Sequence, residues 1–146
     1  MNEDLLDKGI ELPIMEEFYT LQGEGIQTGR AAYFVRLGGC DVACEWCDTK
    51  ESWNSNLFPP KKVDDMILRV MVTKAQSVVV TGGEPLNWNL DYLCQKLKEN
   101  NILTFLETSG SQPLSGVWNW ICVSPKKITS PLQHILDKAN ELKVII

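Results

Sequence analysis

Short apolar segments alternate with amphipathic helical segments along most of the chain, and this alternation limits the folds it can adopt. Residues 77–81, "SVVVT", form a continuous run rich in β-branched residues, typical of a strand buried on both faces. Such alternation predicts an α/β fold with right-handed crossovers and a mostly parallel sheet. Strands are expected at 14–21, 31–37, 77–81, 102–107, 120–124 and 141–146, and helices at 63–75, 89–100 and in a short segment from Ser130.

Two of the expected helices carry an apolar stripe at helical spacing. The stripe of the segment 63–75 is formed by Val63, Ile67, Val70 and Met71. The stripe of the segment 89–100 is formed by Leu90, Leu93, Cys94 and Leu97, and Asn89 is the expected N-cap. We therefore expect both helices to bury these stripes against the sheet.

Length and charge narrow the fold and the function. With 146 residues, the chain is expected to form one domain over 1–146. A complete eight-stranded barrel needs roughly 250 residues, so the prediction is a partial, open TIM-like barrel. No apolar run could span a membrane, and the acidic N-terminus lacks an apolar signal core, which predicts a cytoplasmic location. A net charge of −5 without a Lys/Arg cluster disfavours nucleic-acid binding.

Polar or glycine-containing loops follow four of the expected parallel strands. They are "CDVACEWCDT" after 31–37, "TGGEP" after 77–81, "ETSGS" after 102–107 and "SPKK" after 120–124. The carboxyl ends of parallel strands share one edge of the sheet, and ligands bind at that edge. Glycine lets the backbone approach a ligand closely, and hydroxyl groups can hydrogen bond to it. One such loop could be a simple turn, but four at one edge predict a binding site.

Three cysteines lie within eight positions, at Cys40, Cys44 and Cys47. Disulfides are rare in cytosolic proteins, so clustered thiols indicate metal binding or redox chemistry. A structural zinc site usually has four ligands, and a [4Fe–4S] cluster is usually held by four cysteines. Three cysteines would leave one iron of such a cluster without a protein ligand, and that iron could bind a small molecule.

The remaining candidate ligands do not complete a zinc site. Cys94 and Cys122 lie within apolar patterns and are expected in the core. His134 lies off the apolar stripe of its segment and is expected to be a solvated surface residue. The sequence thus favours an open iron–sulfur cluster over structural zinc.

The C-x3-C-x2-C spacing resembles the motif of the radical S-adenosylmethionine enzymes. Trp46, just before Cys47, fits the aromatic position of that motif. The resemblance implies that Cys40, Cys44 and Cys47 hold a [4Fe–4S] cluster whose open iron binds the amino and carboxylate groups of S-adenosylmethionine. In this superfamily an electron from the cluster cleaves the sulfonium and releases a 5′-deoxyadenosyl radical.

A finer resemblance covers the chain from about Glu17 to its last residues. The segments "FYTLQGEGIQTGRAAYFVRLGGC", "CDT", "TGGEP", "ETSGS", "SPK" and "ELKV" are similar to the 7-carboxy-7-deazaguanine synthase family. The resemblance implies a shortened, open barrel, commonly a homodimer. It also implies conversion of 6-carboxy-5,6,7,8-tetrahydropterin to 7-carboxy-7-deazaguanine with loss of ammonia, Mg²⁺ assistance and an electron donor such as flavodoxin or ferredoxin.

The resemblance also implies a role for individual residues. Thr49 matches the residue whose hydroxyl oxygen coordinates Mg²⁺, a hard cation that prefers oxygen ligands. The expected S-adenosylmethionine-binding residues are Trp46, Cys47, Asp48, Gly83, Glu84, Ser124, Pro125 and Lys126. The expected pterin-binding residues are Leu21, Gln22, Gly23, Glu24, Arg36 and Thr81. Arg36 lies within an apolar strand, where it could equally form a structural ion pair.

Two other classes of function stay open at this stage. Another radical S-adenosylmethionine enzyme, such as a glycyl-radical activase, shares the cysteine motif but needs neither "LQGEG" nor a metal-binding Thr49. A small non-enzymatic module could bind zinc or iron. Family members usually continue well past "ELKV", so the C-terminal part of the family fold, with further cofactor and substrate contacts, is expected to be missing.

Overall fold

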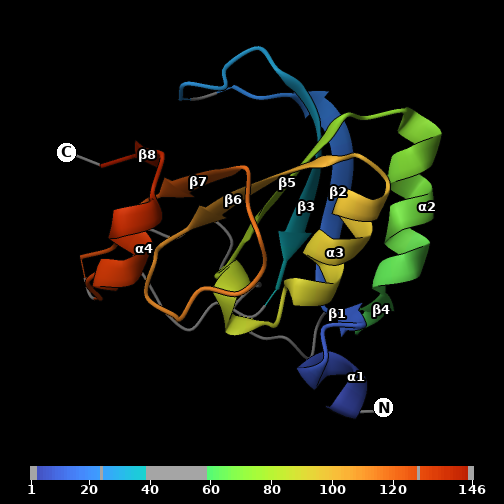
Figure 1. Ribbon diagram of the computed structural model, residues 1–146, viewed down its shortest axis with the longest axis horizontal. Coiled ribbons are helices and arrows are strands. Elements are labelled where there is room, and N and C mark those ends of the chain that lie inside the picture. Colours follow the sequence, from blue (N-terminus) through green and yellow to red (C-terminus); the bar gives the residue numbers. More distant parts are fainter. Residues whose placement is uncertain (1–2, 24, 39–58, 128, 145–146) are drawn as a thin grey trace.

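A six-stranded sheet forms the centre of the protein, and the computed structural model describes residues 3–23, 25–38, 59–127 and 129–144. Figure 1 shows the sheet with its helices. The described elements are α1 (Glu3–Asp7), β1 (Glu11–Leu12), β2 (Ile14–Leu21), β3 (Ala31–Leu37), β4 (Lys61–Lys62), α2 (Val63–Thr73), β5 (Ser77–Gly82), η3 (Pro85–Asn87), α3 (Asp91–Glu99), β6 (Leu103–Thr108), β7 (Trp120–Val123), α4 (Gln133–Lys138) and β8 (Glu141–Leu142).

The strand order of the sheet is β2-β3-β5-β6-β7-β8. β2 pairs antiparallel with β3, and every later neighbouring pair is parallel. This confirms the predicted α/β fold with a mostly parallel, open sheet. A second, two-stranded antiparallel sheet joins β1 and β4 and was not predicted.

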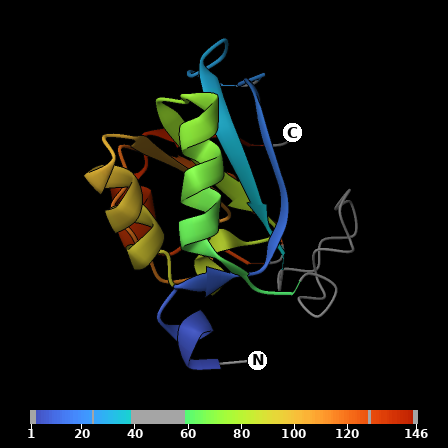
Figure 2. The ribbon, with the colours of Figure 1, turned by 90° about the vertical axis from the view of Figure 1, so that its right-hand side faces the viewer.

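The helices cover one face of the sheet, as Figure 2 shows for α2 and α3. The main core lies beneath them and takes alternate residues of the strands, such as Val35, Val80 and Leu106, all 0% exposed. The other residues of the same strands, among them Phe34, Val79 and Phe105, form a smaller cluster on the opposite face. Among the described residues no helix is long and apolar enough to cross a membrane.

The apolar stripe of α3 is buried as predicted, but that of α2 is shifted. Val63, Met66, Ile67 and Val70 are buried in α2, whereas Met71 is 46% exposed. At about 100° per residue the four buried positions share a narrow arc, and Met71 lies beyond its margin. The expected stripe therefore contained one wrong residue and omitted Met66.

Many predicted element ends differ from the structure by one or two residues, and three differences concern a cap or a larger shift. The N-cap of α3 is Leu90, one residue after the predicted Asn89, although the Asn89 side chain still accepts a hydrogen bond from the amide of Asp91 and donates one to the carbonyl of Asp7. The short helix expected from Ser130 begins only at Gln133. β8 ends at Leu142, since its partner β7 ends at Val123 and offers no further edge.

An ion-pair network ties β2 to α2 across the helical face. The carboxylate of Glu17 accepts hydrogen bonds from Arg69 Nε (3.0 Å), Arg69 Nη2 (2.7 Å) and the Tyr33 hydroxyl (2.7 Å). Burial alone would raise the pKa of Glu17, but these hydrogen bonds and the Arg69 charge outweigh it and hold the pKa below its ordinary value. Burial and the Glu17 carboxylate together raise the pKa of Tyr33 to about 12.

Glu17→Gln is expected to lower the free energy of unfolding by about 1–3 kcal/mol at pH 7, because it weakens charged hydrogen bonds to a largely buried group. A depressed folded-state pKa stabilises the protein above the ordinary value of 4.5, and this contribution is lost as the pH falls through the folded-state pKa. Urea denaturation at pH 7 and near pH 4 should therefore show a larger difference between wild type and variant at pH 7.

Glu16→Gln is the matched control for this prediction. Glu16 pairs with Arg36 at 2.9 Å, but its side chain is 50% exposed. An exposed pair of this kind contributes about 0–1 kcal/mol. An equal or larger loss of stability in Glu16→Gln would contradict the role given to Glu17.

Candidate functional site

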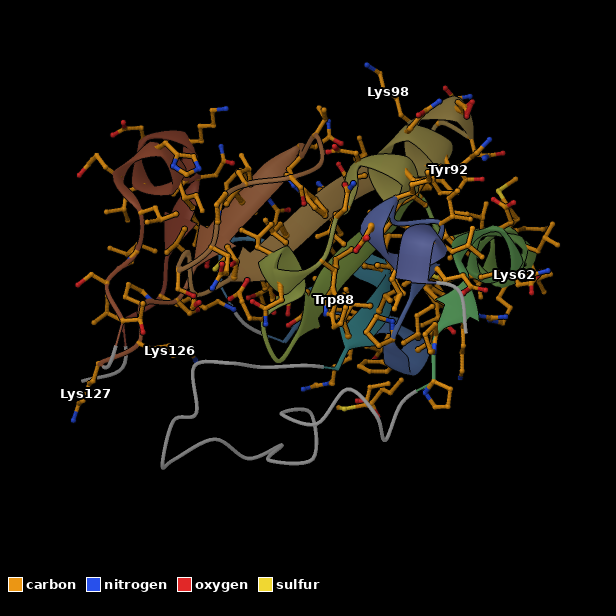
Figure 3. The ribbon with its side chains drawn as sticks, turned by 90° about the horizontal axis from the view of Figure 1, so that it is seen from below. Lys62, Trp88, Tyr92, Lys98, Lys126 and Lys127 are labelled. Carbon is orange, nitrogen blue, oxygen red and sulfur yellow. The ribbon has the colours of Figure 1, made fainter. Side chains whose placement is uncertain are left out.

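The carboxyl ends of β3, β5, β6 and β7 lie at one edge of the sheet, as predicted from the loops. Leu37 of β3 is in register with Gly82 of β5, and Thr108 of β6 with Val123 of β7. Figure 3 views the protein from below, with Trp88 near the middle and Lys126 toward one side. The "CDVACEWCDT" segment lies outside the described residues, and the chain that leads to it is described as far as Gly38.

Three hydrogen bonds fix the chain where it leaves β3 toward the cysteine motif. The amide of Gly83 donates to the carbonyl of Leu37 (3.0 Å), and the amide of Gly38 donates to that of Pro13 (2.9 Å). The indole of Trp88 donates to the carbonyl of Gly38 (3.0 Å). Leu37 and Gly38 are thus held at the same edge as the "TGGEP" loop.

Gly82 allows β3 and β5 to approach closely at this edge. Its φ is +142°, and an added Cβ would lie 2.2 Å from the carbonyl oxygen and 2.6 Å from the nitrogen of Leu37. Both are backbone atoms of the neighbouring strand, which cannot rotate away. The close packing of β3 against β5 therefore requires a glycine at position 82, the first glycine of "TGGEP".

Gly82→Ala is expected to destabilise the protein by about 3 kcal/mol or more, because it adds a backbone clash to backbone strain. Gly29→Ala is the matched control, since Gly29 also has a positive φ, +88°, but no atom lies within 4 Å of its added Cβ. That control should cost only about 1 kcal/mol. Equal midpoints in thermal unfolding for the two variants would refute the packing argument.

Polar side chains form a row across the sheet face that the helices leave uncovered. Strand alternation places Arg36, Thr81, Glu107 and Cys122 on the same face as Phe34, Val79 and Phe105. The register pairs Arg36 with Thr81, Glu107 with Cys122, and Cys122 with Glu141. The row crosses five strands near their carboxyl ends, which is where α/β barrels bind ligands.

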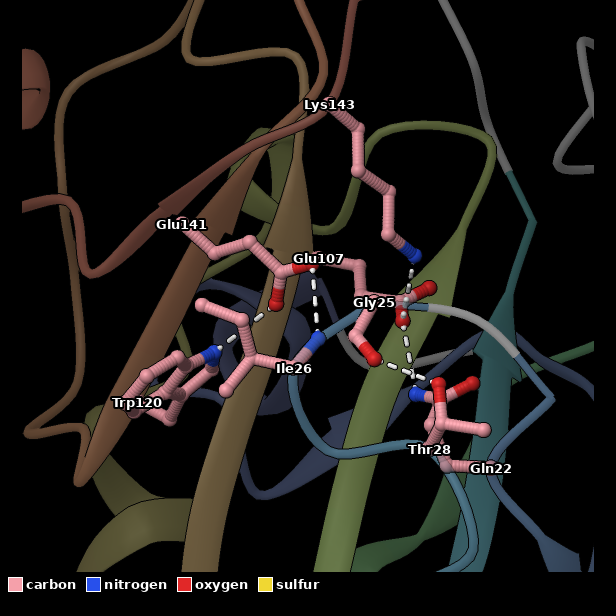
Figure 4. Close-up of polar contacts among 8 residues, drawn as sticks. All are labelled: Gln22, Gly25, Ile26, Thr28, Glu107, Trp120, Glu141 and Lys143. Carbon is pink, nitrogen blue, oxygen red and sulfur yellow. Dashed lines mark hydrogen bonds and ion pairs between the residues drawn. The ribbon is translucent and has the colours of Figure 1, made fainter.

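The loop 22–30 folds across this face, and we call it the cross-sheet loop. Gln22 Nε2 donates to Glu107 Oε2 (3.1 Å), and Lys143 Nζ lies 3.8 Å from the same oxygen (Figure 4). The guanidinium of Arg30 lies 5.2 Å from the centre of the Phe105 ring. The loop therefore connects the end of β2 to β6, three positions away in the strand order, across the uncovered face.

Glu141 fixes the far end of the cross-sheet loop. Its carboxylate accepts hydrogen bonds from the Ile26 amide (3.3 Å) and from the Trp120 indole (3.2 Å), both drawn in Figure 4. Within the loop, the Thr28 hydroxyl donates to the carbonyl of Gly25. The space enclosed beside Gln22, Glu107 and Glu141 is about 10 Å³, room for about one water molecule.

The structure brings together most of the expected site residues that it describes. Gly83, Ser124, Pro125 and Lys126 lie half-buried at the carboxyl edge, and Thr81 lies on the uncovered face. Gln22 is half-buried against Glu107, whereas Leu21 and Gly23 are exposed. The expected residues outside the described part of the chain are Glu24, Cys40, Cys44, Trp46, Cys47, Asp48 and Thr49.

Two expected residues have protein partners in the structure. Arg36 forms the ion pair with Glu16 that the sequence left open as an alternative, and its side chain is 28% exposed. Glu84 is 0% exposed and accepts hydrogen bonds from neighbouring loops. Arg36 thus pairs across the uncovered face, and the Glu84 carboxylate is bound inside the protein.

Three polar residues of the uncovered face were missed by sequence reasoning: Glu107, Glu141 and Lys143. The polar members Glu107, Glu141 and Lys143 lie at or next to strand ends, in "ETSGS" and "ELKV". Strand alternation could have grouped Glu107 with Phe105, but it could not say which face is free of helices. That requires the packing of α2 and α3.

The cysteines outside the motif are core residues, as predicted. Cys94 and Cys122 are each 3% exposed. Burial raises the pKa of the Cys94 thiol to about 12 and that of Cys122 to about 11, so both are protonated near neutral pH. Within the described residues no group of three or more His, Cys, Asp or Glu side chains could hold a metal ion.

Comparison with known proteins gives consistent matches along the chain. Residues 21–136 match the family described as a 4Fe-4S single cluster domain. The chain is 55% identical to 7-carboxy-7-deazaguanine synthase of Flavobacterium psychrophilum, over 97% of this chain and 67% of that protein. It is 47% identical to the synthase of a Synechocystis species, over 94% and 66% of the two chains.

A solved structure has the same fold. The crystal structure of QueE from Escherichia coli superimposes with a TM-score of 0.83 at 34% identity, covering 98% of this chain and 74% of that chain. The chain thus spans about two thirds of the length of its curated relatives and about three quarters of the solved structure.

Proposed function

Because the chain belongs to the 7-carboxy-7-deazaguanine synthase family, we propose that it catalyses the conversion of 6-carboxy-5,6,7,8-tetrahydropterin to 7-carboxy-7-deazaguanine with loss of ammonia. Relatives in this family are radical S-adenosylmethionine enzymes of queuosine biosynthesis. The family predicted from the sequence is confirmed. The observation that carries the proposal is the convergence of the "TGGEP", "ETSGS" and "SPK" loops at the carboxyl edge, beside the polar row of the uncovered face.

Family membership also decides between the classes of function that the cysteine motif left open. A glycyl-radical activase would not account for 55% identity with a deazaguanine synthase across 97% of the chain. A purely structural metal module would need no row of polar side chains across five strands. The enzyme reading is therefore retained.

The residues at the carboxyl edge fit S-adenosylmethionine by their chemistry. The hydroxyls of Ser111 and Ser124 and the ammonium of Lys126 supply donors and acceptors for a charged amino acid and a ribose. Cys40, Cys44 and Cys47 would hold the [4Fe–4S] cluster, and Trp46, Cys47, Asp48, Gly83, Ser124, Pro125 and Lys126 would surround the nucleoside, with Glu84 buried behind Gly83. When bound, the cluster and S-adenosylmethionine supply one-electron chemistry.

The uncovered face would bind the pterin. Glu107 can accept hydrogen bonds from the amino and ring N–H groups of a pterin, while Lys143, 3.8 Å from it, can attract the substrate carboxylate. Leu21, Gln22, Gly23, Glu24, Arg36 and Thr81 belong to the same proposed site. A bicyclic ligand needs far more than about 10 Å³, so binding beside Glu107 requires Gln22 to give up its hydrogen bond to that carboxylate.

Further features belong to the same proposal. Thr49 would supply an oxygen ligand to Mg²⁺, with substrate and water completing the coordination shell. The protein would act as a single domain and a homodimer, with flavodoxin or ferredoxin as electron donor and without nucleic acid or membrane as partner. A cytoplasmic location would keep the cysteine thiols reduced and able to bind iron.

Anaerobic reconstitution tests the proposal. Protein purified and reconstituted without oxygen should bind about four irons per chain and, with S-adenosylmethionine, Mg²⁺ and a reductant, release 7-carboxy-7-deazaguanine from the tetrahydropterin. A brown protein that cleaves S-adenosylmethionine but leaves the pterin unchanged would favour another radical enzyme. A colourless protein with one zinc would favour the metal-binding module.

A further inference from the structure

Glu84 is a charged side chain buried where three strand ends meet. It follows β5, and its relative exposure is 0%. Its Oε1 accepts hydrogen bonds from the amide (2.8 Å) and the hydroxyl (2.6 Å) of Ser109. Its Oε2 accepts hydrogen bonds from the amide of Leu86 (2.9 Å) and the hydroxyl of Thr108 (2.6 Å). A buried carboxylate needs such partners, and Glu84 has four.

These four hydrogen bonds use the acceptor capacity of the carboxylate. An ionised carboxylate has two oxygens and about four acceptor positions. Each oxygen of Glu84 already accepts from one backbone amide and one hydroxyl. No acceptor position is then left for the ammonium group of an amino acid ligand.

The partners of Glu84 connect it to the other loops of the carboxyl edge. The carbonyl of Thr108 accepts from the amide of Ser124 at the end of β7 (2.8 Å). The hydroxyl of Ser109 lies 2.9 Å from that of Ser111, and the hydroxyl of Thr108 accepts from the amide of Gly110 (3.0 Å). On its other side, Glu84 follows Gly83, which is bound to the end of β3.

We propose that Glu84 is a positioning residue that fixes Gly83, the loop 108–111 and Ser124 relative to one another, and that it does not bind the amino group of S-adenosylmethionine itself. The inference rests on the proposed function, because Gly83 and Ser124 are the groups that would touch the nucleoside. It replaces the direct contact expected for Glu84 with an indirect role, and it gives Thr108 and Ser109 a part in cofactor binding.

Glu84→Gln tests this role sharply. A glutamine has one oxygen and one NH₂ group, and each oxygen of Glu84 faces a backbone amide that can only donate. In either orientation the NH₂ group therefore opposes a backbone N–H. Hydrogen–deuterium exchange of the amide that faces the NH₂ group, Leu86 or Ser109, should accelerate, with no such change in Glu99→Gln, which alters the net charge at an exposed site.

Two ligands distinguish positioning from direct contact, measured by calorimetry on the reconstituted protein. S-adenosylhomocysteine keeps the amino acid group, and 5′-methylthioadenosine lacks it. If Glu84 positions the loops, Glu84→Gln should lower the affinity for both ligands by a similar factor, about tenfold for one lost charged hydrogen bond. Thr108→Val replaces the hydroxyl with a methyl group, and Ser109→Ala replaces it with a hydrogen. Both variants should also weaken the binding of both ligands, and they keep the test valid if Glu84→Gln does not fold.

Three outcomes would overturn the inference. A loss confined to S-adenosylhomocysteine, with Thr108→Val and Ser109→Ala unaffected, would make Glu84 a direct ligand while leaving the proposed function intact. Unchanged exchange at both Leu86 and Ser109 would remove the positioning network. A wild-type protein that binds neither ligand would refute the nucleoside site itself, and with it the proposed function.

Discussion

Cys40→Ala, Cys44→Ala and Cys47→Ala are each expected to abolish assembly of the [4Fe–4S] cluster and cleavage of S-adenosylmethionine. With only two thiolates in the motif, the cluster loses one of the three ligands that the chain supplies. Iron content, the absorbance of anaerobically reconstituted protein and release of 5′-deoxyadenosine measure the effect. Each variant should fall to the background of protein without iron.

Cys94→Ala and Cys122→Ala are the matched controls. Both thiols are buried and have raised pKa values, about 12 and about 11, so neither offers the thiolate that iron requires. Each substitution removes one buried sulfur atom and should cost about 1 kcal/mol of stability while the iron content stays unchanged. Loss of the cluster in either control would show that the ligand set includes a residue outside the motif.

The order of strands and helices could be predicted because burial leaves a clear pattern in the chain. The run 77–81 is apolar on both faces, and the structure buries β5 in the middle of the sheet. The stripe Leu90, Leu93, Cys94 and Leu97 is buried in α3 without exception. Such patterns are local, and the structure of these elements follows them.

Element ends depend on partners that lie far away in the sequence. The Asn89 side chain, expected to cap α3, also binds the carbonyl of Asp7, 82 residues earlier, and the N-cap lies at Leu90. β8 covers Glu141–Leu142, the two residues in register with Cys122 and Val123 at the end of β7. Neither contact can be read from the local pattern.

The location of the candidate site was predictable, but its composition was only partly so. Parallel strands place their following loops at one edge, and this predicted that the "TGGEP" and "SPKK" loops meet, whereas Gly83 and Ser124 were expected only from the family resemblance. Glu107 and Lys143 belong to the site because the helices cover the opposite face and the cross-sheet loop reaches them. The local sequence pattern does not show which face of the sheet the helices will cover.

Thr49→Ala is expected to uncouple radical formation from product formation. If the Thr49 hydroxyl holds Mg²⁺ against the substrate, its loss should leave the iron content and the uncoupled cleavage of S-adenosylmethionine nearly unchanged. Product formation should fall at least about tenfold and no longer respond to Mg²⁺, because one of the few protein oxygen ligands is gone. Release of 5′-deoxyadenosine and of product, followed in parallel over a Mg²⁺ titration, separates the two effects.

Thr49→Ser is the control, because it keeps the hydroxyl oxygen and removes only a methyl group. It should retain much of the Mg²⁺ response, since a hard cation recognises the oxygen and not the methyl group beside it. A glycyl-radical activase or a structural zinc module has no reason to separate alanine from serine at this position. Normal product formation with unchanged Mg²⁺ dependence in Thr49→Ala would refute the role of Thr49 as a Mg²⁺ ligand.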